Sequence, residues 1–369
     1  MKFDPQKPYN NLPLLPPNTN IENTEILKKC IAARSALAEL KQAGRLIPNQ
    51  AVLINTIPLL EAQLSSQIEN IVTTADKLFQ FTSADDEKAD APTKETLRYR
   101  QALHQGYRSL KRKPVCTRTA VEICRTILNT NINIRKVPGT ALKNPQTQQI
   151  IYTPPEGETL IRDKLSNWEK FIHENTDLDP LIRMAVMHYQ FEAIHPFIDG
   201  NGRTGRLLNI LFLIQQDLLE IPVLFLSRYI INHKNDYYNL MRAVTEKKQW
   251  QPWILYMLDA VEQTAEWTRQ KIITIQDLVN HTCDYVKQKL PKIYSRELID
   301  ITFTQPYCRI ANIVDAGIAQ RQTASTYLKQ LAEIGILNEQ KFGRDVLFLH
   351  PKFLNLLTQN KNNFKKYSD

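Results

Sequence analysis

A stretch of twelve residues, His195 to Arg206, constrains this chain more than any other part of the sequence. Its sequence is His-Pro-Phe-Ile-Asp-Gly-Asn-Gly-Arg-Thr-Gly-Arg, and it holds three of the ten glycines of the chain. Gly200 and Gly202, on either side of Asn201, permit the tight backbone turns that point successive N–H groups at one spot. The apolar run 207–214 predicts that a helix follows. A nest of N–H groups that opens into a helix N-terminus is typical of a phosphate site.

The side chains of this stretch indicate what happens to the phosphate. Arg203 and Arg206 lie three residues apart on the first helical turn, where two guanidinium groups can hold phosphate oxygens without losing their charge. Asp199 is a single carboxylate at the edge of the nest, which suits Mg²⁺ bound jointly with substrate phosphates. His195 titrates near neutral pH and is the candidate general base. The tetrapeptide 199–202 alone is more typical of a plain turn, but its combination with these groups favours the phosphate site.

The whole stretch resembles the HPFx[D/E]GNGRxxR signature of the Fic (Fido) family and matches it at every defined position. This resemblance implies a mainly α-helical core with a β-hairpin flap, and transfer of AMP from ATP to a Tyr, Thr or Ser hydroxyl of a target protein. The lead-in 185–194 is also similar to the family, and helical spacing predicts that His188 is a core histidine. The ATP-binding residues that the resemblance implies are Gly200, Asn201, Gly202, Arg203, Thr204, Gly205 and Arg206.

In the implied mechanism, His195 takes the proton of the target hydroxyl, which attacks the α-phosphate of ATP in line. Mg²⁺ at Asp199 bridges the α- and β-phosphates, while Asn201, the nest and both arginines stabilise the leaving pyrophosphate. Two alternatives stay open. Family members with this loop can transfer other phosphate-containing groups, or remove AMP with a glutamate such as Glu69 aligning water. The chain could also be a DNA-binding regulator in which the nucleotide site only senses ATP.

A second motif lies upstream, on a helix predicted over about 56–70. Ser65 and Glu69 are four residues apart and share a face of that helix. Their spacing alone favours a solvated glutamate on a surface helix. The run Ser65-x-x-x-Glu69-Asn70 nevertheless resembles the [S/T]xxxE[G/N] inhibitory motif of Fic proteins. The resemblance implies that Glu69 pairs with Arg206 and occupies the position that the ATP γ-phosphate needs.

Residues 134–153 break the helical pattern and predict a β-hairpin with a turn over 143–147. A lone hairpin is marginally stable unless it packs on something. The resemblance implies that it is the flap, along which a segment of the target protein adds as an extra strand. Tyr237 and Tyr238 resemble family residues that enclose adenine, although plain core packing explains them as well. Thr245 departs from the asparagine that some relatives have there.

The end of the chain, 291–369, is predicted to be a separate unit. Residues 310–316, a turn at Gly317 and residues 320–334 predict helix, turn and helix, and two short strands follow. This order resembles a winged helix-turn-helix, whose second helix would present polar side chains to the major groove of DNA. Eleven Lys and Arg against seven Asp and Glu make only a mild excess for a DNA reader. A protein-contact or dimerisation module of the same shape fits equally well, so a homodimer also stays open.

The chain is therefore predicted to have three parts. The net charge of +9 favours polyanionic partners, and five cysteines without a CxxC pair indicate neither a disulfide framework nor a zinc site. We find no signal-peptide core and no apolar run that could span a bilayer, so we expect a cytoplasmic protein without a membrane partner. The predicted parts are 1–112 with the inhibitory helix, 113–290 with the flap 134–153 and the catalytic loop 195–206, and 291–369. Further helices are predicted over 21–44, 94–110, 117–128, 160–174 and, as one or two helices, 254–290.

Overall fold

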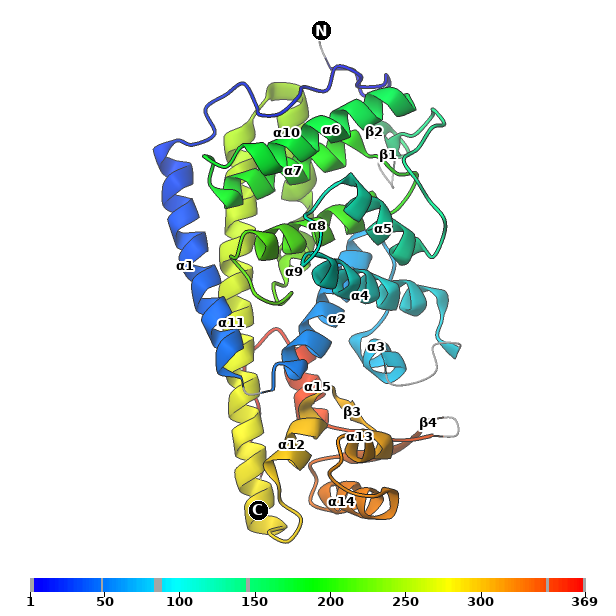
Figure 1. Cartoon of the computed structure of the whole chain (residues 1–369), viewed down its shortest axis with the longest axis vertical. Helices are drawn as coiled ribbons and strands as arrows, with labels where there is room; N and C mark the ends of the chain where they lie inside the picture. The colour runs from blue at the N-terminus through cyan, green and yellow to red at the C-terminus, as the bar shows by residue number, and fades with distance from the viewer. Residues whose placement is uncertain (1–2, 48, 83–87, 144–146, 343–344, 368–369) are drawn as a thin grey trace.

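The computed structural model describes residues 3–47, 49–82, 88–143, 147–342 and 345–367 of the 369-residue chain. α-Helices dominate these residues and stack along the long axis of the molecule (Figure 1). The prediction of a mainly helical fold is therefore confirmed. Within these ranges, no helix combines the length and the apolar character that crossing a bilayer requires.

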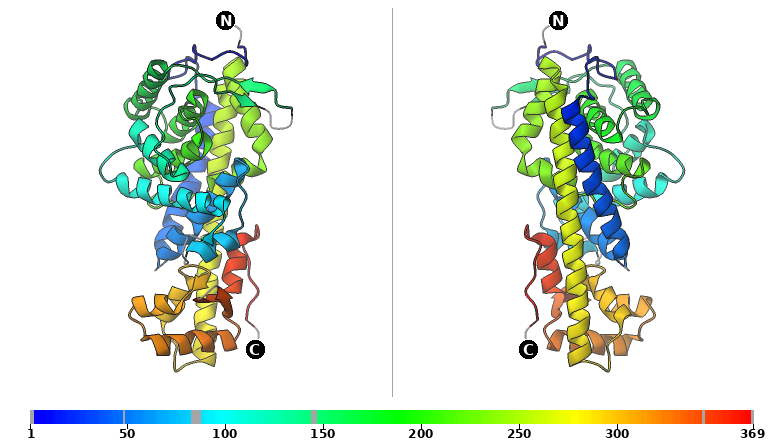
Figure 2. Two further views of the ribbon diagram at one scale, coloured as in Figure 1. Left: turned by 90° about the vertical axis from the view of Figure 1, so that its right-hand side faces the viewer. Right: turned by 90° about the vertical axis from the view of Figure 1, so that its left-hand side faces the viewer.

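Two long helices form one side of the molecule. α1 (Thr24–Leu46) and α11 (Trp250–Lys289) lie side by side in Figures 1 and 2. α11 is one helix of 40 residues, so it extends for about 60 Å. It therefore reaches from the helices around residues 195–206 to the C-terminal elements. The predicted end of α1 at Gly44 is wrong, because the helix continues through this glycine to Leu46.

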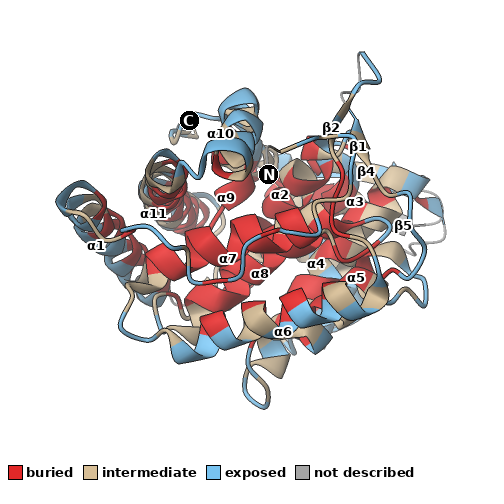
Figure 3. Cartoon of the chain, turned by 90° about the horizontal axis from the view of Figure 1, so that it is seen from above, coloured by how far each residue is buried: buried red, intermediate tan, exposed pale blue. Residues whose placement is uncertain are grey.

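The catalytic stretch is surrounded by α4 (Ala91–Ser109), α5 (Thr117–Leu128), α6 (Glu158–Glu174), α7 (Pro180–Ile194), α8 (Asn201–Gln215), α9 (Leu226–Asn232) and α10 (Lys234–Lys247). α7 buries almost all of its side chains, as is typical of a helix at the centre of a core. Figure 3 shows α7 and α8 buried, with the more exposed α6 beside them. Trp168 and Phe171 of α6 are buried against this centre. The helices predicted over 117–128 and 160–174 are confirmed to within two residues.

The segment that carries Glu69 consists of α2 (Ala51–Ile68), a turn, and α3 (Ala75–Thr82). α2 begins before the predicted start near residue 56, and Pro58 lies inside it rather than in its first turn. Pro58 has no N–H to donate to the carbonyl of Ile54, and the buried side chains of Val52 and Leu53 anchor the turn before it. Asn70 ends the helix in the left-handed conformation, with φ of 63°, as expected of a C-terminal Asn.

The predicted hairpin over 134–153 is much smaller in the structure. β1 (Leu142–Lys143) and β2 (Ile150–Tyr152) pair antiparallel, and residues 144–146 of the predicted turn lie outside the described ranges. Residues before β1 do not extend the strand because Arg135 hydrogen-bonds the catalytic loop instead. The N-terminal lead supports the hairpin, since the Tyr9 N–H donates to the Thr153 carbonyl at 3.0 Å.

The C-terminal elements contain the predicted helix, turn, helix and two strands. Gly317, with φ of 70°, forms the turn between the two helices. The elements are α12 (Arg296–Phe303), β3 (Tyr307–Cys308), α13 (Ile310–Asp315), α14 (Arg321–Glu333), β4 (Asn338–Phe342), β5 (Asp345–Leu349) and α15 (Pro351–Thr358). β5 pairs antiparallel with both β3 and β4, so the sheet has three strands rather than the two predicted.

This C-terminal unit does not have a core of its own. Its buried side chains belong to one apolar cluster, here called the shared core, that also includes residues of α2, α3 and the second half of α11. Leu59 and Phe79, for example, are buried in the same cluster as Phe303 and Leu328. The shared core continues across the predicted boundary at residue 291, which follows the end of α11.

The shared core predicts that the two parts unfold together. Phe79→Ala should destabilise the fold by about 3–5 kcal/mol, because it opens a cavity where the ring is fully buried. Urea denaturation followed by hydrogen-exchange mass spectrometry should show α2 and α14 losing protection in one transition, because both contribute to the shared core. Phe81→Ala, at a half-buried ring of the same helix as Phe79, is the control and should cost less. Separate transitions for α2 and α14 would contradict the shared core.

Candidate active site

The backbone of the catalytic loop has the predicted form. α7 ends at His195, which is left-handed with φ of 50°, and Gly200, with φ of 82°, precedes the first residue of α8. The Asn201 side chain bridges the loop: its amide donates to the Phe197 carbonyl at 2.8 Å, and the Phe197 N–H donates to its oxygen at 2.9 Å. The first N–H groups of α8 therefore open toward the loop, as an anion site requires.

His195 is held in the form that a general base needs. Burial, and secondly the positive charge of Arg135, lower the pKa of His195 to about 4. The ring is therefore neutral near physiological pH and free to accept a proton. Arg135 also binds the loop directly, since its Nε donates to the His195 carbonyl at 2.8 Å.

Arg203 does not point freely into the site. Its guanidinium is buried and forms an ion pair with Glu95 of α4, and Nη2 lies 3.5 Å from Asp199 Oδ1. Sequence reasoning missed Glu95, which lies on a half-exposed helix among other polar residues and carries no distinguishing pattern. The ion pair with Glu95 holds the Arg203 guanidinium in place at the first turn of α8.

Asp199 fits the predicted Mg²⁺ site as a single ligand. Its side chain is 69% exposed, and one oxygen accepts a hydrogen bond from the Gly200 N–H at 2.6 Å. Mg²⁺ commonly takes one or two protein carboxylates and completes its shell with waters and phosphates. Among the residues that the structure describes, no cluster of three or more His, Cys, Asp or Glu could hold a metal by itself.

Arg206 meets the predicted inhibitory residues. The buried guanidinium donates from Nε to Ser65 Oγ at 2.9 Å, and from Nη2 to the Ser65 carbonyl and to Glu69 Oε1, both at 2.9 Å. Although burial opposes the charge, Arg206 lowers the pKa of Glu69. Burial also opposes the charge of Arg206, but the nearby Glu69 carboxylate raises the pKa of Arg206 above its ordinary value. Both groups are therefore charged, and the predicted contact is present.

Gly202 allows Glu69 to come this close. A Cβ atom at position 202 would lie 2.2 Å from Glu69 Oε1 and 2.9 Å from Arg206 Nη1. Any larger residue there would push the carboxylate or the guanidinium away. The closeness of Glu69 and Arg206 thus explains the glycine at position 202, which lies within α8 and has no positive φ.

Thr204 and Gly205 lie in the packing between α7 and α8 rather than at an open surface. Both are buried, and a Cβ at position 205 would lie 2.4 Å from Glu192 Oε1 and 3.3 Å from the His188 ring. Their predicted contact with ATP is therefore not accessible in this conformation. His188 is hydrogen-bonded to the Tyr237 hydroxyl at 2.8 Å, which confirms its prediction as a core histidine.

The two tyrosines predicted to enclose adenine differ in their environment. Tyr237 is 2% exposed, and its hydroxyl is occupied by His188. Tyr238 is 42% exposed, so of this pair only its ring faces solvent. Thr245 is hydrogen-bonded to the Tyr189 hydroxyl at 2.9 Å. Core packing, the alternative explanation, thus describes Tyr237. The Tyr238 ring is exposed and could contact a nucleotide base.

Two buried carboxyl groups near the site were not singled out from the sequence. Burial raises the pKa of Glu192 on α7 to about 8, and that of Glu61 on α2 to about 7. Glu61 accepts hydrogen bonds from the Ser227 N–H, at 2.9 Å, and from the Ser227 hydroxyl, which join α2 to α9. One signal could have found it, because Glu61 is the single charged residue in the sequence of α2.

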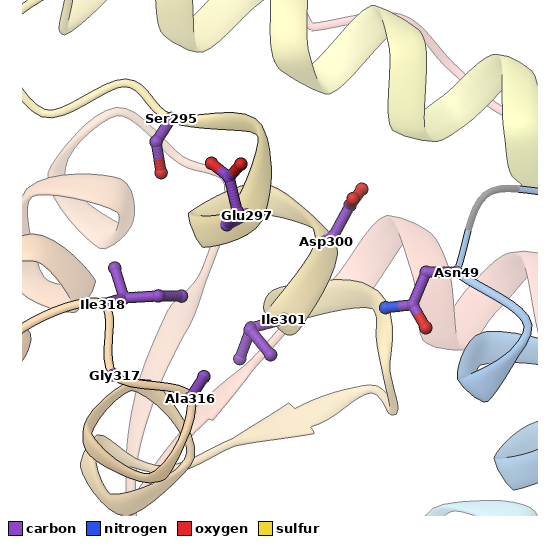
Figure 4. A pocket seen from close by; sticks show the side chains of 8 residues that line it. All are labelled: Asn49, Ser295, Glu297, Asp300, Ile301, Ala316, Gly317 and Ile318. Atoms are coloured by element: carbon purple, nitrogen blue, oxygen red, sulfur yellow. The ribbon is translucent and has the colours of Figure 1, made fainter.

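A cavity of about 650 Å³ lies away from this site, at the junction of the segment before α2 with the C-terminal unit. Figure 4 shows Asn49 facing α12 across this cavity. The other lining residues belong to the C-terminal unit, and they are Ser295, Glu297, Asp300, Ile301, Ala316, Gly317 and Ile318. No residue of the catalytic loop lines it.

Three family models match successive parts of the chain. The Fic/DOC family N-terminal model matches residues 27–108, the Fic/DOC family model matches 114–213, and the model of the C-terminal domain of SoFic-like protein adenylyltransferases matches 278–353. The chain is also similar to proteins named protein adenylyltransferase Fic from two flies. The protein of Drosophila yakuba is 26% identical over 205 residues, which are 55% of this chain and 36% of that protein. The protein of Drosophila erecta is 30% identical over 169 residues, which are 46% of this chain and 29% of that protein.

The matched region is thus about a third of these relatives' length. Among solved structures, a Fic family protein from Desulfovibrio desulfuricans G20 has a TM-score of 0.56 and 16% identity over 91% of this chain and 98% of that one. Residues 134–508 of Fic-1 from C. elegans have a TM-score of 0.51 and 18% identity, over 69% of this chain and 74% of that one. These likenesses show the fold, and the three models cover the N-terminal helices, the catalytic loop and the C-terminal unit. The chain therefore belongs to the Fic/DOC family.

Proposed function

We propose that this chain transfers AMP from ATP to Tyr, Thr or Ser hydroxyls of a target protein, and that Glu69 keeps it inactive. The observation that carries the proposal is the contact of Arg206 with Ser65 and Glu69 at the first turn of α8. A guanidinium at that place suits bidentate binding of phosphate oxygens when no carboxylate holds it. The names of the fly relatives support the same chemistry.

His195 would act as the general base. Its neutral ring takes the proton of the target hydroxyl as the hydroxyl oxygen bonds to the α-phosphorus of ATP. The bond from that phosphorus to the bridging oxygen breaks, and pyrophosphate leaves with the electron pair. The N–H groups at the start of α8, together with Arg203 and Arg206, would stabilise the negative charge on the leaving group.

Asp199 would hold Mg²⁺ beside the phosphates. When bound, the ion supplies positive charge that neutralises the phosphate oxygens. The exposed carboxylate can serve this role because only one of its oxygens is bonded to the Gly200 N–H. The Asp199 side chain stays exposed to solvent although Arg203 Nη2 lies 3.5 Å from that same oxygen.

Glu69 would inhibit by competing with phosphate for Arg206. Its carboxylate takes Nη2, and Ser65 takes Nε, so two positions of the guanidinium fork are already used. A γ-phosphate that approached this fork would have to displace the carboxylate. Loss of the carboxylate leaves the guanidinium with its bonds to Ser65 but without an anionic partner, and a phosphate can then supply the anion.

The target protein would bind along the 134–153 segment. β1 and β2 form a two-stranded sheet whose pairing is completed by no third strand in the described ranges. A free strand edge suits addition of an extended target segment through main-chain hydrogen bonds. Ile151 and Ile198 are exposed apolar side chains, on the hairpin and on the catalytic loop, and would contact the target beside its hydroxyl.

A DNA-binding regulator that only senses ATP is a second candidate. It is favoured by one observation: Arg321, Gln322 and Thr323, in the first turn of α14, are all exposed, as in a helix that reads base edges. DNA affinity that falls steeply with salt and is lost in Arg321→Ala would support it. A protein-contact module of the same shape would show no such affinity.

The transfer proposal predicts opposite effects of two substitutions. Glu69→Gly should raise AMP transfer about 5- to 150-fold, the usual size of a regulatory coupling. His195→Ala in that background should lower it about 10²- to 10⁴-fold, because the general base is lost. Intact-mass analysis after incubation with Mg²⁺ and α-labelled ATP measures AMP added to the chain itself and to candidate targets.

Glu174→Gly, at an exposed glutamate that ends α6, is the matched control and should behave as wild type. A different mass increment would identify another transferred group, and loss of AMP from a pre-modified target would identify the reverse reaction. If Glu69→Gly transfers nothing in any of these assays, the proposed enzyme is wrong and the DNA-binding candidate gains.

The lowered pKa of His195 predicts the pH dependence of the activated enzyme. The ring loses its catalytic form only when pH falls through its folded pKa of about 4, rather than through the ordinary value of about 6.5. The rate of the Glu69→Gly variant should therefore stay constant from about pH 7.5 down to about pH 5.5. Initial rates across this range test it, and a decline centred near pH 6.5 would show that the ring has an ordinary pKa.

A further inference from the structure

Arg135 occupies an unusual position between the flap segment and the catalytic loop. The residue is 2% exposed, and its hydrogen bonds go to main-chain carbonyls. Its Nε donates to the His195 carbonyl at 2.8 Å, its Nη2 donates to Ile194 at 3.3 Å and to Pro155, and its backbone N–H donates to Pro196 at 2.9 Å. Three consecutive carbonyls around the candidate base are thus held by one residue.

The hydrogen bonds of Arg135 stabilise a backbone conformation that would otherwise be unfavourable. His195 has a positive φ, which is costly for a residue other than glycine unless neighbouring contacts enforce it. The carbonyls of Ile194 and His195 also stand at the C-terminal end of α7, where the helix leaves them without partners. A guanidinium satisfies both and places a positive charge at the negative end of the helix.

We propose that Arg135 is a positioning residue for His195: it fixes the backbone from which the ring projects and ties that backbone to the end of the flap at Pro155. This inference rests on the proposed function. Arg135 touches no reacting atom, so it acts through the geometry and the charge state of His195. The charged groups that face the ring are Arg135 from the flap segment, Glu69 from the turn after α2 and Asp199 from the loop, and Arg135 is the cation among them.

Two substitutions separate geometry from charge. In the Glu69→Gly background, Arg135→Lys and Arg135→Gln should both lower kcat about 10- to 100-fold, because the ring is misplaced by a fraction of an ångström or more. The KM for ATP should change less than about twofold, since the hydrogen bonds of Arg135 go to residues 155 and 194–196, outside the residues proposed to bind ATP. The acid limb of kcat should move to higher pH in Arg135→Gln, which removes the charge, and stay in place in Arg135→Lys.

Arg118→Gln, at a side chain that is 81% exposed, is the control for loss of an arginine. Unchanged kcat in both variants, or KM rising as much as kcat falls, would overturn the positioning role. Circular dichroism checks the fold, and Arg135→Lys carries the test if Arg135→Gln unfolds. If the Glu69→Gly parent itself has no activity, the proposed function fails separately. The role of Arg135 is then judged by NMR titration of the His195 ring, whose pKa should rise in Arg135→Gln.

A second inference rests on a different observation, the packing of the C-terminal unit on the segment that carries Glu69. Figure 1 shows α2 and α3 between the catalytic helices and the C-terminal elements. The shared core joins both helices to that unit. Its members on α2 and α3 are Val52, Leu59, Leu60, Ala75, Leu78 and Phe79.

Polar and aromatic contacts add to this packing at α3. The hydroxyl of Tyr307 on β3 donates to Asp76 Oδ1 at 2.6 Å and accepts from Gln80 Nε2 at 2.9 Å. The rings of Phe81 and Phe342 meet edge to face, with centroids 5.4 Å apart. These contacts fix the helix that begins six residues after Glu69.

The opposite side of the same segment faces the active site. Ser65 and Glu69 hold Arg206, and the Lys234 Nζ on α10 donates to the Ile68 carbonyl at 2.6 Å. The segment therefore has two partners, the catalytic helices and the C-terminal unit. We infer that the C-terminal unit sets how firmly Glu69 holds Arg206, so that a change at that unit is transmitted through α2 and α3 to the active site.

This inference also rests on the proposed function and predicts a conditional effect. Tyr307→Phe, which removes only the hydroxyl, should raise AMP transfer of the otherwise wild-type chain about 2- to 30-fold, the range that residues within a coupling network usually produce. In the Glu69→Gly background the same substitution should change the rate less than about twofold, since no inhibitory contact is left to loosen. Tyr327→Phe, on α14 of the same unit, is the control and should have no effect.

No gain in Tyr307→Phe, or an equal gain with and without Glu69, would overturn the coupling. An inactive Glu69→Gly parent would instead reject the proposed function. Hydrogen exchange of the wild-type and Tyr307→Phe chains keeps the coupling testable in that case. Amides of residues 65–71 should exchange faster in the variant, while those of α7 should not.

Discussion

The buried guanidinium of Arg206 is the constraint on which the rest of this structure depends. Arginine keeps its proton in proteins, so a guanidinium that is 1% exposed needs anionic or polar partners. Ser65 and Glu69 supply them from a helix that is remote in sequence. Removal of Glu69 would leave the buried guanidinium without its anion, although solvent screens part of the loss because the Glu69 side chain is 34% exposed. The position of α2 over the catalytic loop follows from this requirement.

In the proposed function, the same requirement would link inhibition to ATP binding. A phosphate group offers anionic oxygens much like those of a carboxylate, so ATP could replace Glu69 as the anionic partner of Arg206. Glu69 directly follows α2, and α2 is also held by Glu61 at Ser227 and by the shared core. One helix therefore packs both near the loop and against the C-terminal unit.

Local patterns in the sequence predicted most helices, because periodicity and end signals act within a few residues. The helix over 117–128 and the end of α2 at Asn70 are examples. The hairpin over 134–153 was overestimated because Arg135 bonds to the catalytic loop and takes the chain away from strand pairing. The start of α2 was missed because proline is typical of a first helical turn, whereas here Val52 and Leu53 are buried in the core and extend the helix before Pro58. Both errors come from contacts between distant residues, which propensity does not contain.

The sequence by itself determined which groups the loop 195–206 carries: an imidazole, a carboxylate, three glycines and two arginines at fixed spacing. It also determined that Ser65 and Glu69 share a face. Only the tertiary structure decided that Glu95 holds Arg203 and that His188 occupies the hydroxyl of Tyr237. The physical reason is that spacing along a helix specifies neighbours within a turn or two, whereas a buried charge or hydroxyl is satisfied by whichever distant side chain the packing brings to it.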